Sequence, residues 1–209
     1  MCERMFAVAP IVCVLFPRFQ LNVAVGDRAE LLSVPTALAP PPGGVQVVGE
    51  VSLAAEAFGV HPGIRMGEAL ARCPRLSLVP EDPAGVADAW ERILVRLESM
   101  GAGVEPERPG LACFDAQGLL RLHGGIEGVL AAARRALRPP AAPPPVVPTT
   151  RYGVAPSRFA AVAAATRARA RRPVIVSGGR TEAAAFLASM PVSLLRARPA
   201  LAELPEALE

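Results

Sequence analysis

The hydrophobic positions of the chain fall into short runs that predict strands and helices in an irregular order. Residues Ala7–Phe16 are almost all apolar, a pattern typical of a central strand that is buried on both faces. A second apolar patch follows at Glu30–Val34, and an extended pattern resumes at Val45–Val48 after consecutive prolines and glycines at 40–44. Because proline and glycine interrupt regular structure, this part is predicted to form strand, turn and strand.

Helices are predicted in two regions after this, at Val51–Cys73 and from Asp82 onward. Val51–Cys73 carries small and apolar residues at helical spacing in two pieces, separated by a proline–glycine break at 62–63. Asp82 and Pro83 then form a helix start, an N-cap followed by proline at the first helical position. The apolar stripe of this helix consists of Val86, Trp90, Ile93, Leu94 and Leu97. We expect Trp90, Ile93, Leu97 and Phe114 to be in the core.

The second half of the chain predicts a hairpin, further helices and a proline-rich connection. Leu111–Phe114 and Leu119–Leu122 flank a polar turn that ends in Gly118, which predicts a hairpin, and Ile126–Leu137 predicts a helix. The elements expected after the prolines are a strand around Tyr152–Ala155, a helix capped by Ser157 and running to about Ala170, a strand at Pro173–Val176 and a helix from about Thr181 to Ser189. This order predicts an α+β fold with a mixed or antiparallel sheet. The expected parts are residues 1–138, a proline-rich loop or linker at 139–150, and residues 151–209.

Composition and charge narrow the class of protein. Hydrophobic residues make up 52% of the 209 residues, enough to bury a core and to exclude disorder throughout. Residues 1–150 hold 13 Arg against 15 acids, whereas 151–209 hold 9 Arg against 4 acids. A polyanionic partner is therefore expected to meet the C-terminal third.

Cysteine and histidine positions indicate neither a zinc site nor a disulfide framework. Four cysteines are scattered without a C-x-x-C pair, and the two histidines stand alone. A reduced cytoplasmic protein fits best. Arg4 followed by twelve apolar residues also resembles the start of a signal peptide, an alternative to the buried strand.

The segment Ala54–Pro74 carries a first family resemblance. Its skeleton of Gly59-Val60, Gly63, Glu68-Ala69 and Cys73-Pro74 resembles the fingers segment of Y-family DNA polymerases. Further along, Gly153-Val154-Ala155-Pro156-Ser157 with Phe159-Ala160, and then Arg172-Pro173, are similar to the turn entering a palm helix and to the basic residue and proline after it. The resemblance runs colinearly from about Ile11 to Leu195.

The resemblance implies a more specific fold than the pattern of hydrophobic residues does. It predicts a ferredoxin-like polymerase palm with small helical fingers, with the thumb barely begun and the little finger absent. The chain is most similar to the ImuB-like branch of the family, whose members lack catalytic carboxylates.

The resemblance also places the family's metal ligands on named positions. The first aspartate falls on Leu15, and the Asp-Glu pair of the second metal strand falls on Gly110 and Leu111. None of these side chains can bind Mg²⁺, which takes oxygen ligands. No catalytic residue, no metal site and no cofactor are therefore expected. The fingers Tyr and Arg that contact the triphosphate in the family correspond to Leu53 and Glu56.

The basic segment supplies the candidate nucleic-acid contacts. Guanidinium groups suit phosphate oxygens, although arginines near a helix C-terminus also complement the helix dipole. The resemblance favours phosphate contact. The residues predicted to bind DNA, weakly and without sequence preference, are Arg151, Arg158, Arg167, Arg169, Arg171 and Arg172.

Three function classes follow. The first is a non-catalytic Y-family protein of DNA repair and damage-induced mutagenesis, an accessory or adaptor in translesion synthesis and not an enzyme. The second is an active error-prone lesion-bypass polymerase, and the third is a truncated remnant without function. The resemblance implies DNA, an error-prone polymerase, the sliding clamp and other mutagenesis-cassette proteins as partners, with no membrane.

Overall fold

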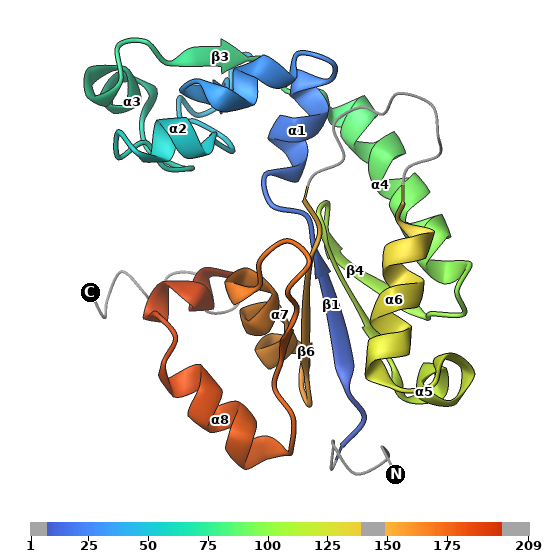
Figure 1. Ribbon diagram of the computed structural model, residues 1–209. Helices are drawn as coiled ribbons and strands as arrows, with labels where there is room; N and C mark the ends of the chain where they lie inside the picture. The colour runs from blue at the N-terminus through green and yellow to red at the C-terminus, as the bar shows by residue number, and fades with distance from the viewer. Residues whose placement is uncertain (1–7, 139–148, 198–209) are drawn as a thin grey trace. The chain divides into compact units, whose positions relative to one another are not determined.

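The computed structural model describes residues 8–138 and 149–197 (Figure 1). These residues belong to two compact units, each assembled from separate segments of the chain. Of these described residues, the first unit takes 8–15, 113–130 and 151–197, and the second takes 16–112, 131–138 and 149–150. Most of the predicted proline-rich loop lies outside the described residues. Within the described ranges, no helix is long and apolar enough to cross a membrane.

The first unit is built on the strands that surround β1. Its strands follow the order β5-β1-β6-β7. Strand β1 (Ile11–Leu15) pairs antiparallel with β6 (Arg151–Ala155), and β6 pairs parallel with β7 (Val174–Ile175). The predicted mixed sheet is therefore confirmed. Val12, Cys13 and Val14 are fully buried, as expected for a central strand.

Helix α7 (Arg158–Arg167) packs against β6 and β1 because its side chains are small. The Ser157 hydroxyl accepts a hydrogen bond from the Ala160 N–H at 3.4 Å, so the predicted cap is confirmed. The helix carries buried alanines at 160, 161, 163, 164 and 165. It lies so close to β6 that a Cβ on Gly153 would stand 2.2 Å from the Ala161 oxygen and the Ala165 nitrogen.

The other elements of the first unit follow the sheet strands in sequence. They are β5 (Leu111–Asp115, shared at its start with the second unit), α5 (Gln117–His123), the start of α6 (Ile126–Ala136), α8 (Arg180–Ala188) and the 3-10 helix η2 (Val192–Ala197). The side chain of Phe114 on β5 is buried, as predicted.

The second unit contains short helices and a small two-stranded sheet. Its elements are α1 (Phe19–Val25), the 3-10 helix η1 (Ala29–Ser33), β2 (Thr36–Leu38), α2 (Leu53–Glu56), α3 (Met66–Arg72), β3 (Ser77–Val79), α4 (Pro83–Glu98) and β4 (Val104–Arg108), with most of α6. Strands β2 and β3 are parallel. A core of small and branched residues, among them Val48, Val51 and Val60, holds α2 and α3 together.

Helix α4 confirms the most detailed local prediction. The Asp82 carboxylate accepts a hydrogen bond from the Gly85 N–H at 2.9 Å, with Pro83 at the helix start. Trp90 is buried and its ring lies edge-on to Phe16 and Phe19, with centroid distances of 6.3 and 5.5 Å. Leu97 is buried, whereas Ile93 is only half-buried.

Three local predictions are wrong. Residues 119–122 lie in α5 instead of a strand. The chain turns into this helix at its N-cap Ala116, and the Asp115 carboxylate just before it accepts a hydrogen bond from the Gln117 N–H at 2.7 Å. The tight turn lies earlier, between β4 and β5, where Gly110 has a φ of 86°. Glu30–Val34 lies largely in η1, and Val45–Val48 contributes only an isolated bridge between Val47 and Arg65.

Candidate nucleic-acid interface

Leu15, Arg151 and Arg172 lie at the same end of the sheet in the first unit. Leu15, at the end of β1, is the Cα partner of Arg151, at the start of β6. Gly153 pairs with Val174 in the parallel β6–β7 ladder. Arg151 lies two residues before Gly153, and Arg172 lies two residues before Val174. The two arginines therefore occupy corresponding positions on neighbouring segments of the sheet. Two arginines therefore flank the same end of the sheet as Leu15.

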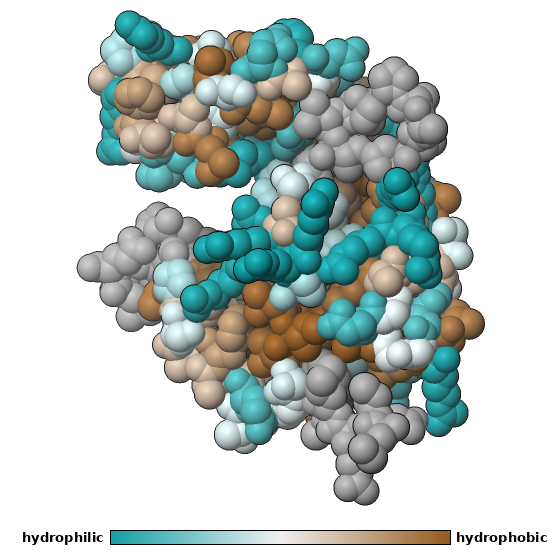
Figure 2. Space-filling model, in the orientation of Figure 1, coloured by the Kyte–Doolittle hydropathy of each residue, from teal (hydrophilic) through white to brown (hydrophobic). Residues whose placement is uncertain are grey.

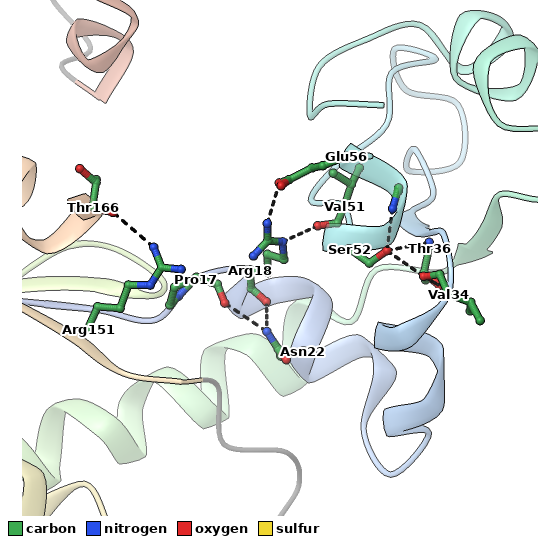
Figure 3. Close-up of polar contacts among 11 residues, drawn as sticks. Pro17, Arg18, Asn22, Val34, Thr36, Val51, Ser52, Glu56, Arg151 and Thr166 are labelled. Atoms are coloured by element: carbon green, nitrogen blue, oxygen red, sulfur yellow. Dashed lines mark hydrogen bonds and ion pairs between the residues drawn. The ribbon is translucent and has the colours of Figure 1, made fainter. Parts of the chain in front are cut away.

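The Arg151 side chain is held on the α7 side of this edge. Side chains two apart in a strand share a face, and Gly153 faces α7. The Arg151 Nη1 atom donates to the Thr166 carbonyl oxygen at 3.3 Å (Figure 3). Thr166 belongs to the last turn of α7, whose carbonyls lack helical partners. Arg151 thus has a structural role as well as a charge.

A tight turn carries the next three arginines. The Arg169 N–H donates to the Arg172 carbonyl oxygen at 3.2 Å, and the Arg172 N–H donates to the Arg169 carbonyl oxygen at 3.0 Å. Arg171 has a left-handed backbone with a φ of 65°, which a non-glycine residue adopts only under local constraint. Arg167, Arg169, Arg171 and Arg172 are all exposed. Hydrophilic residues gather over this end of α7 in Figure 2.

Five of the six predicted arginines therefore lie at one end of α7, and we call Arg151, Arg167, Arg169, Arg171 and Arg172 the arginine edge. Arg158 does not join them, because it is the first residue of α7. A helix of ten residues is about 15 Å long, so Arg158 lies at the opposite end.

The charge around the arginine edge is unbalanced within its own segment. Residues 151–197 hold eight arginines and a single acid, Glu182. The Glu182 carboxylate accepts a hydrogen bond from the Gly179 N–H at 2.7 Å at the start of α8. That hydrogen bond lowers the pKa of Glu182. The segment therefore supplies no acid dedicated to neutralising the arginine edge.

The positions that the resemblance assigned to metal ligands lie at the end of β1 and at the turn before β5. Leu15 and Leu111 are buried apolar side chains, and Gly110 has no side chain. The Phe16 N–H, directly after Leu15, donates to the Gly110 carbonyl oxygen at 2.8 Å. Asp115 lies near the other end of β1, since the adjacent Ala116 N–H donates to the Pro10 carbonyl oxygen. Among the residues that the structure covers, no group of three or more His, Cys, Asp and Glu could hold a metal ion.

Glu56 has an ionic partner that the sequence did not reveal. Its Oε1 atom lies 2.7 Å from the Arg18 Nη2 atom, and the Arg18 Nε atom donates to the Val51 carbonyl oxygen at 2.8 Å (Figure 3). Arg18 has a left-handed backbone, with a φ of 53°, at the N-cap of α1. These bonds join the start of α1 to α2 within the second unit.

A second carboxylate, Glu50, is half-buried near the same helix start. Its Oε2 atom accepts a hydrogen bond from the Leu21 N–H at 3.0 Å. Burial raises the pKa of Glu50 above its ordinary value of 4.5, although backbone hydrogen bonds and the charges of Arg108 and Arg18 oppose the shift. Sequence reasoning missed this group because its environment depends on distant residues.

Comparison with protein families gives a match over most of the chain. The model of the impB/mucB/samB family matches residues 14–166. Two curated relatives, both named DNA polymerase IV, come from Dehalococcoides mccartyi. One is 26% identical over 189 residues, covering 90% of this chain and 47% of the relative, and the other is 25% identical over 177 residues, covering 85% and 44%. The chain spans about half the length of these relatives.

Solved structures share the fold. The crystal structure of DinB from Sulfolobus solfataricus is 20% identical, with a TM-score of 0.71, and the match covers 93% of this chain and 57% of that one. A ternary complex of Dbh is 18% identical, also with a TM-score of 0.71, covering 95% and 56%. These likenesses confirm the predicted fold class, a polymerase palm with fingers.

The comparisons correct one hypothesis from the sequence. The absence of carboxylates at Leu15, Gly110 and Leu111 led to the expectation that the chain is not an enzyme. Both curated relatives are named DNA polymerase IV, the name of an enzyme, which contradicts this expectation. The hypothesis is wrong because three aligned positions do not outweigh a family match that extends over residues 14–166.

Proposed function

Because this chain belongs to the impB/mucB/samB family, we propose that the protein is of the Y-family DNA polymerase type and acts on damaged DNA, in repair and translesion synthesis. The family match over residues 14–166 carries the proposal. The relatives named DNA polymerase IV support it. In this proposal the chain provides the palm and fingers.

The proposal assigns DNA contact to the arginine edge. Four of its five arginines are exposed and Arg151 is half-buried, and all five belong to a segment, residues 151–197, that holds one acid. Guanidinium groups bind phosphate oxygens through paired donors. Phosphate contacts of this kind bind DNA without reading its sequence. Arg158, at the other end of α7, would contribute to a separate part of the DNA surface.

The complete protein would also meet other damage-response proteins. An error-prone polymerase, the sliding clamp and mutagenesis-cassette proteins remain proposed partners, in the cytoplasm, on the resemblance to the ImuB-like branch. The proposal adds this recruiting role to the polymerase-type function.

Primer extension and DNA binding together test the proposal. The purified protein is mixed with a labelled primer–template, either undamaged or carrying an abasic site, in Mg²⁺ and deoxynucleotides. We expect binding to both substrates and primer extension past the lesion. If the protein neither binds nor extends either substrate, the proposal is contradicted. If it binds DNA without extending the primer, the polymerase-type function is contradicted and only the proposed DNA contact remains.

A further inference from the structure

We infer that Cys13 and Cys113 form a cross-strand thiol pair that a two-electron oxidant, a peroxide, converts reversibly to a disulfide. The two residues lie 100 positions apart in the chain, on the adjacent strands β1 and β5. Both belong to the first unit, and both are in the thiol form in the structure. The pair is a modification site that is independent of the proposed DNA contact.

Two backbone hydrogen bonds set the register of β1 against β5. The Ala116 N–H donates to the Pro10 carbonyl oxygen at 2.9 Å. The Phe16 N–H donates to the Gly110 carbonyl oxygen at 2.8 Å. Residue numbers rise along β1 as they fall along β5, so the two strands are antiparallel. Each cysteine lies midway between the two bonds, three residues from either one on its own strand, and the two cysteines are therefore directly opposite each other.

The cysteines occupy a non-hydrogen-bonded position of this ladder. In an antiparallel pair of strands, positions that exchange backbone hydrogen bonds alternate with positions that do not. The hydrogen-bonded pair of Pro10 and Ala116 lies three positions away, an odd number, so the cysteines are at a position of the other kind. Cα atoms at such positions are about 4.5 Å apart, and a disulfide needs roughly 4.4–6.8 Å. A sulfur–sulfur bond thus fits without a large backbone movement.

Both cysteine side chains lie on the face of the sheet that α7 covers. Cys13 is the Cα partner of Gly153 on β6, and a Cβ on Gly153 would meet backbone atoms of α7. Residues directly opposite each other in an antiparallel ladder share a face, so Cys113 lies on this face as well. The two cysteines are 0% and 1% exposed. An oxidant therefore reaches them only when this part of the unit opens locally, and opening is expected to limit the rate of oxidation.

The reaction balances with hydrogen peroxide as the oxidant. One thiol takes an oxygen atom from the peroxide, which gives a sulfenic acid and one water. The second thiol attacks that sulfur, the sulfur–sulfur bond forms, and the sulfenic oxygen leaves as a second water. Two electrons pass from the thiols to the peroxide. Because the partner thiol is fixed beside the first, condensation is expected to precede further oxidation, and an added dithiol reverses the bond by exchange.

Peptide mapping of the oxidised parent protein tests the inference. An arginine lies between each two successive cysteines, so trypsin releases the four cysteines on four separate peptides. The reduced protein is treated with hydrogen peroxide, its remaining thiols are alkylated in denaturant, and it is digested without reduction. We expect the peptide of residues 5–18 to be joined to the peptide of residues 97–121, with Cys73 alkylated.

Buried cysteines also serve as small apolar side chains, and that role alone predicts a different result. Recovery of Cys13 and Cys113 as alkylated thiols or sulfinic acids at every peroxide dose overturns the inference, as does their linkage to Cys2 or Cys73. The same oxidation in urea is the control for proximity. We expect a mixture of cysteine pairings in urea and chiefly one pairing in the folded protein. The same mixture in both conditions also overturns the inference.

Matched variants assign the linkage on a non-reducing denaturing gel. A chain joined across 100 positions is more compact when unfolded, so the oxidised parent should give a faster band that dithiothreitol removes. Cys13→Ala and Cys113→Ala should each lack this band. Cys73→Ala, which removes a buried cysteine of the second unit, should keep it.

A faster band in both pair variants, or none in the parent, contradicts the assignment. Circular dichroism of the reduced variants checks that they keep the fold of the parent, and either pair variant suffices if the other fails to fold.

Discussion

Arg18 and Glu56 form an ion pair, with 2.7 Å between Nη2 and Oε1, that joins the residue before α1 to the last residue of α2. Their side chains are 21% and 36% exposed, so water screens the attraction. Such a pair contributes about 0.2–1 kcal/mol. Arg18 also donates to the Val51 carbonyl oxygen, so the two partners are not equivalent.

We predict that Arg18→Ala is more destabilising than Glu56→Ala. Glu56→Ala removes only the ion pair, whereas Arg18→Ala also leaves the Val51 carbonyl without this donor, at an added cost of about 1 kcal/mol or more. Urea unfolding of both single variants and the double variant measures the difference and the coupling energy. Equal effects of the two single changes would contradict the asymmetry.

We predict that Gly153→Ala destabilises the first unit strongly. The added Cβ would lie 2.2 Å from backbone atoms of Ala161 and Ala165, and a helix backbone cannot rotate away as a side chain can. The expected cost is about 1–3 kcal/mol or more. Gly118→Ala in α5 is the matched control, because no atom lies within 4 Å of its added Cβ. Chemical denaturation should show loss for the first change and none for the second.

We predict that Glu50→Gln removes part of the pH dependence of stability. Because burial raises the pKa of folded Glu50 above 4.5, the folded state holds the proton more tightly than the unfolded state does. The resulting stability is fully present below about pH 4.5 and is lost as pH rises through the raised pKa.

Glutamine keeps an acceptor for the Leu21 N–H without carrying a charge. Relative to the parent, the free energy of unfolding of Glu50→Gln should therefore rise between pH 4.5 and 7. Unfolding curves across this range measure it, with exposed Glu81→Gln as a surface control. A difference that shrinks with increasing pH would refute the prediction.

We predict that Trp90→Ala costs about 3–5 kcal/mol. The side chain is buried and packs edge-on against Phe16 and Phe19, so its removal leaves a large cavity. Trp90→Phe should lose less, because a ring remains to contact both partners. Since Trp90 is the single tryptophan, circular dichroism is the suitable probe. An alanine variant as stable as the parent would contradict this packing.

Local chemistry explains where sequence reasoning succeeded on the fold. Asp82 and Ser157 were predicted as caps because each needs only an N–H three residues ahead. The hairpin predicted around Gly118 is wrong because the chain enters helix α5 directly after β5, with a local hydrogen bond from the Gln117 N–H to the Asp115 carboxylate. The tight turn is at Gly110, where an added Cβ would lie 2.6 Å from the Phe19 Cβ. That constraint comes from a residue 91 positions away, beyond the reach of a local pattern.

For the candidate site, too, the sequence predicted the residues but not their arrangement in space. The six arginines were identified as candidate DNA contacts from the sequence, and the helix that ends near Arg167 was also predicted. Their separation into an edge and the distant Arg158 depends on which end of α7 each occupies. The pairing of Leu15 with Arg151 depends on register between distant strands. Arg18 drew no attention because its partner, Glu56, lies on another element.

The pairing of β1 with β6 affects how the chain folds during synthesis. Leu15 and Arg151 are partners although they lie 136 positions apart in the chain. At about 5–20 residues per second, a ribosome needs on the order of ten seconds to add the residues between them. During that interval β1, apolar on both faces, has left the ribosome without β6 to pair with. An unpaired apolar strand of this kind favours aggregation, so slow synthesis is expected to lower the yield of folded protein more than slow refolding of the complete chain does.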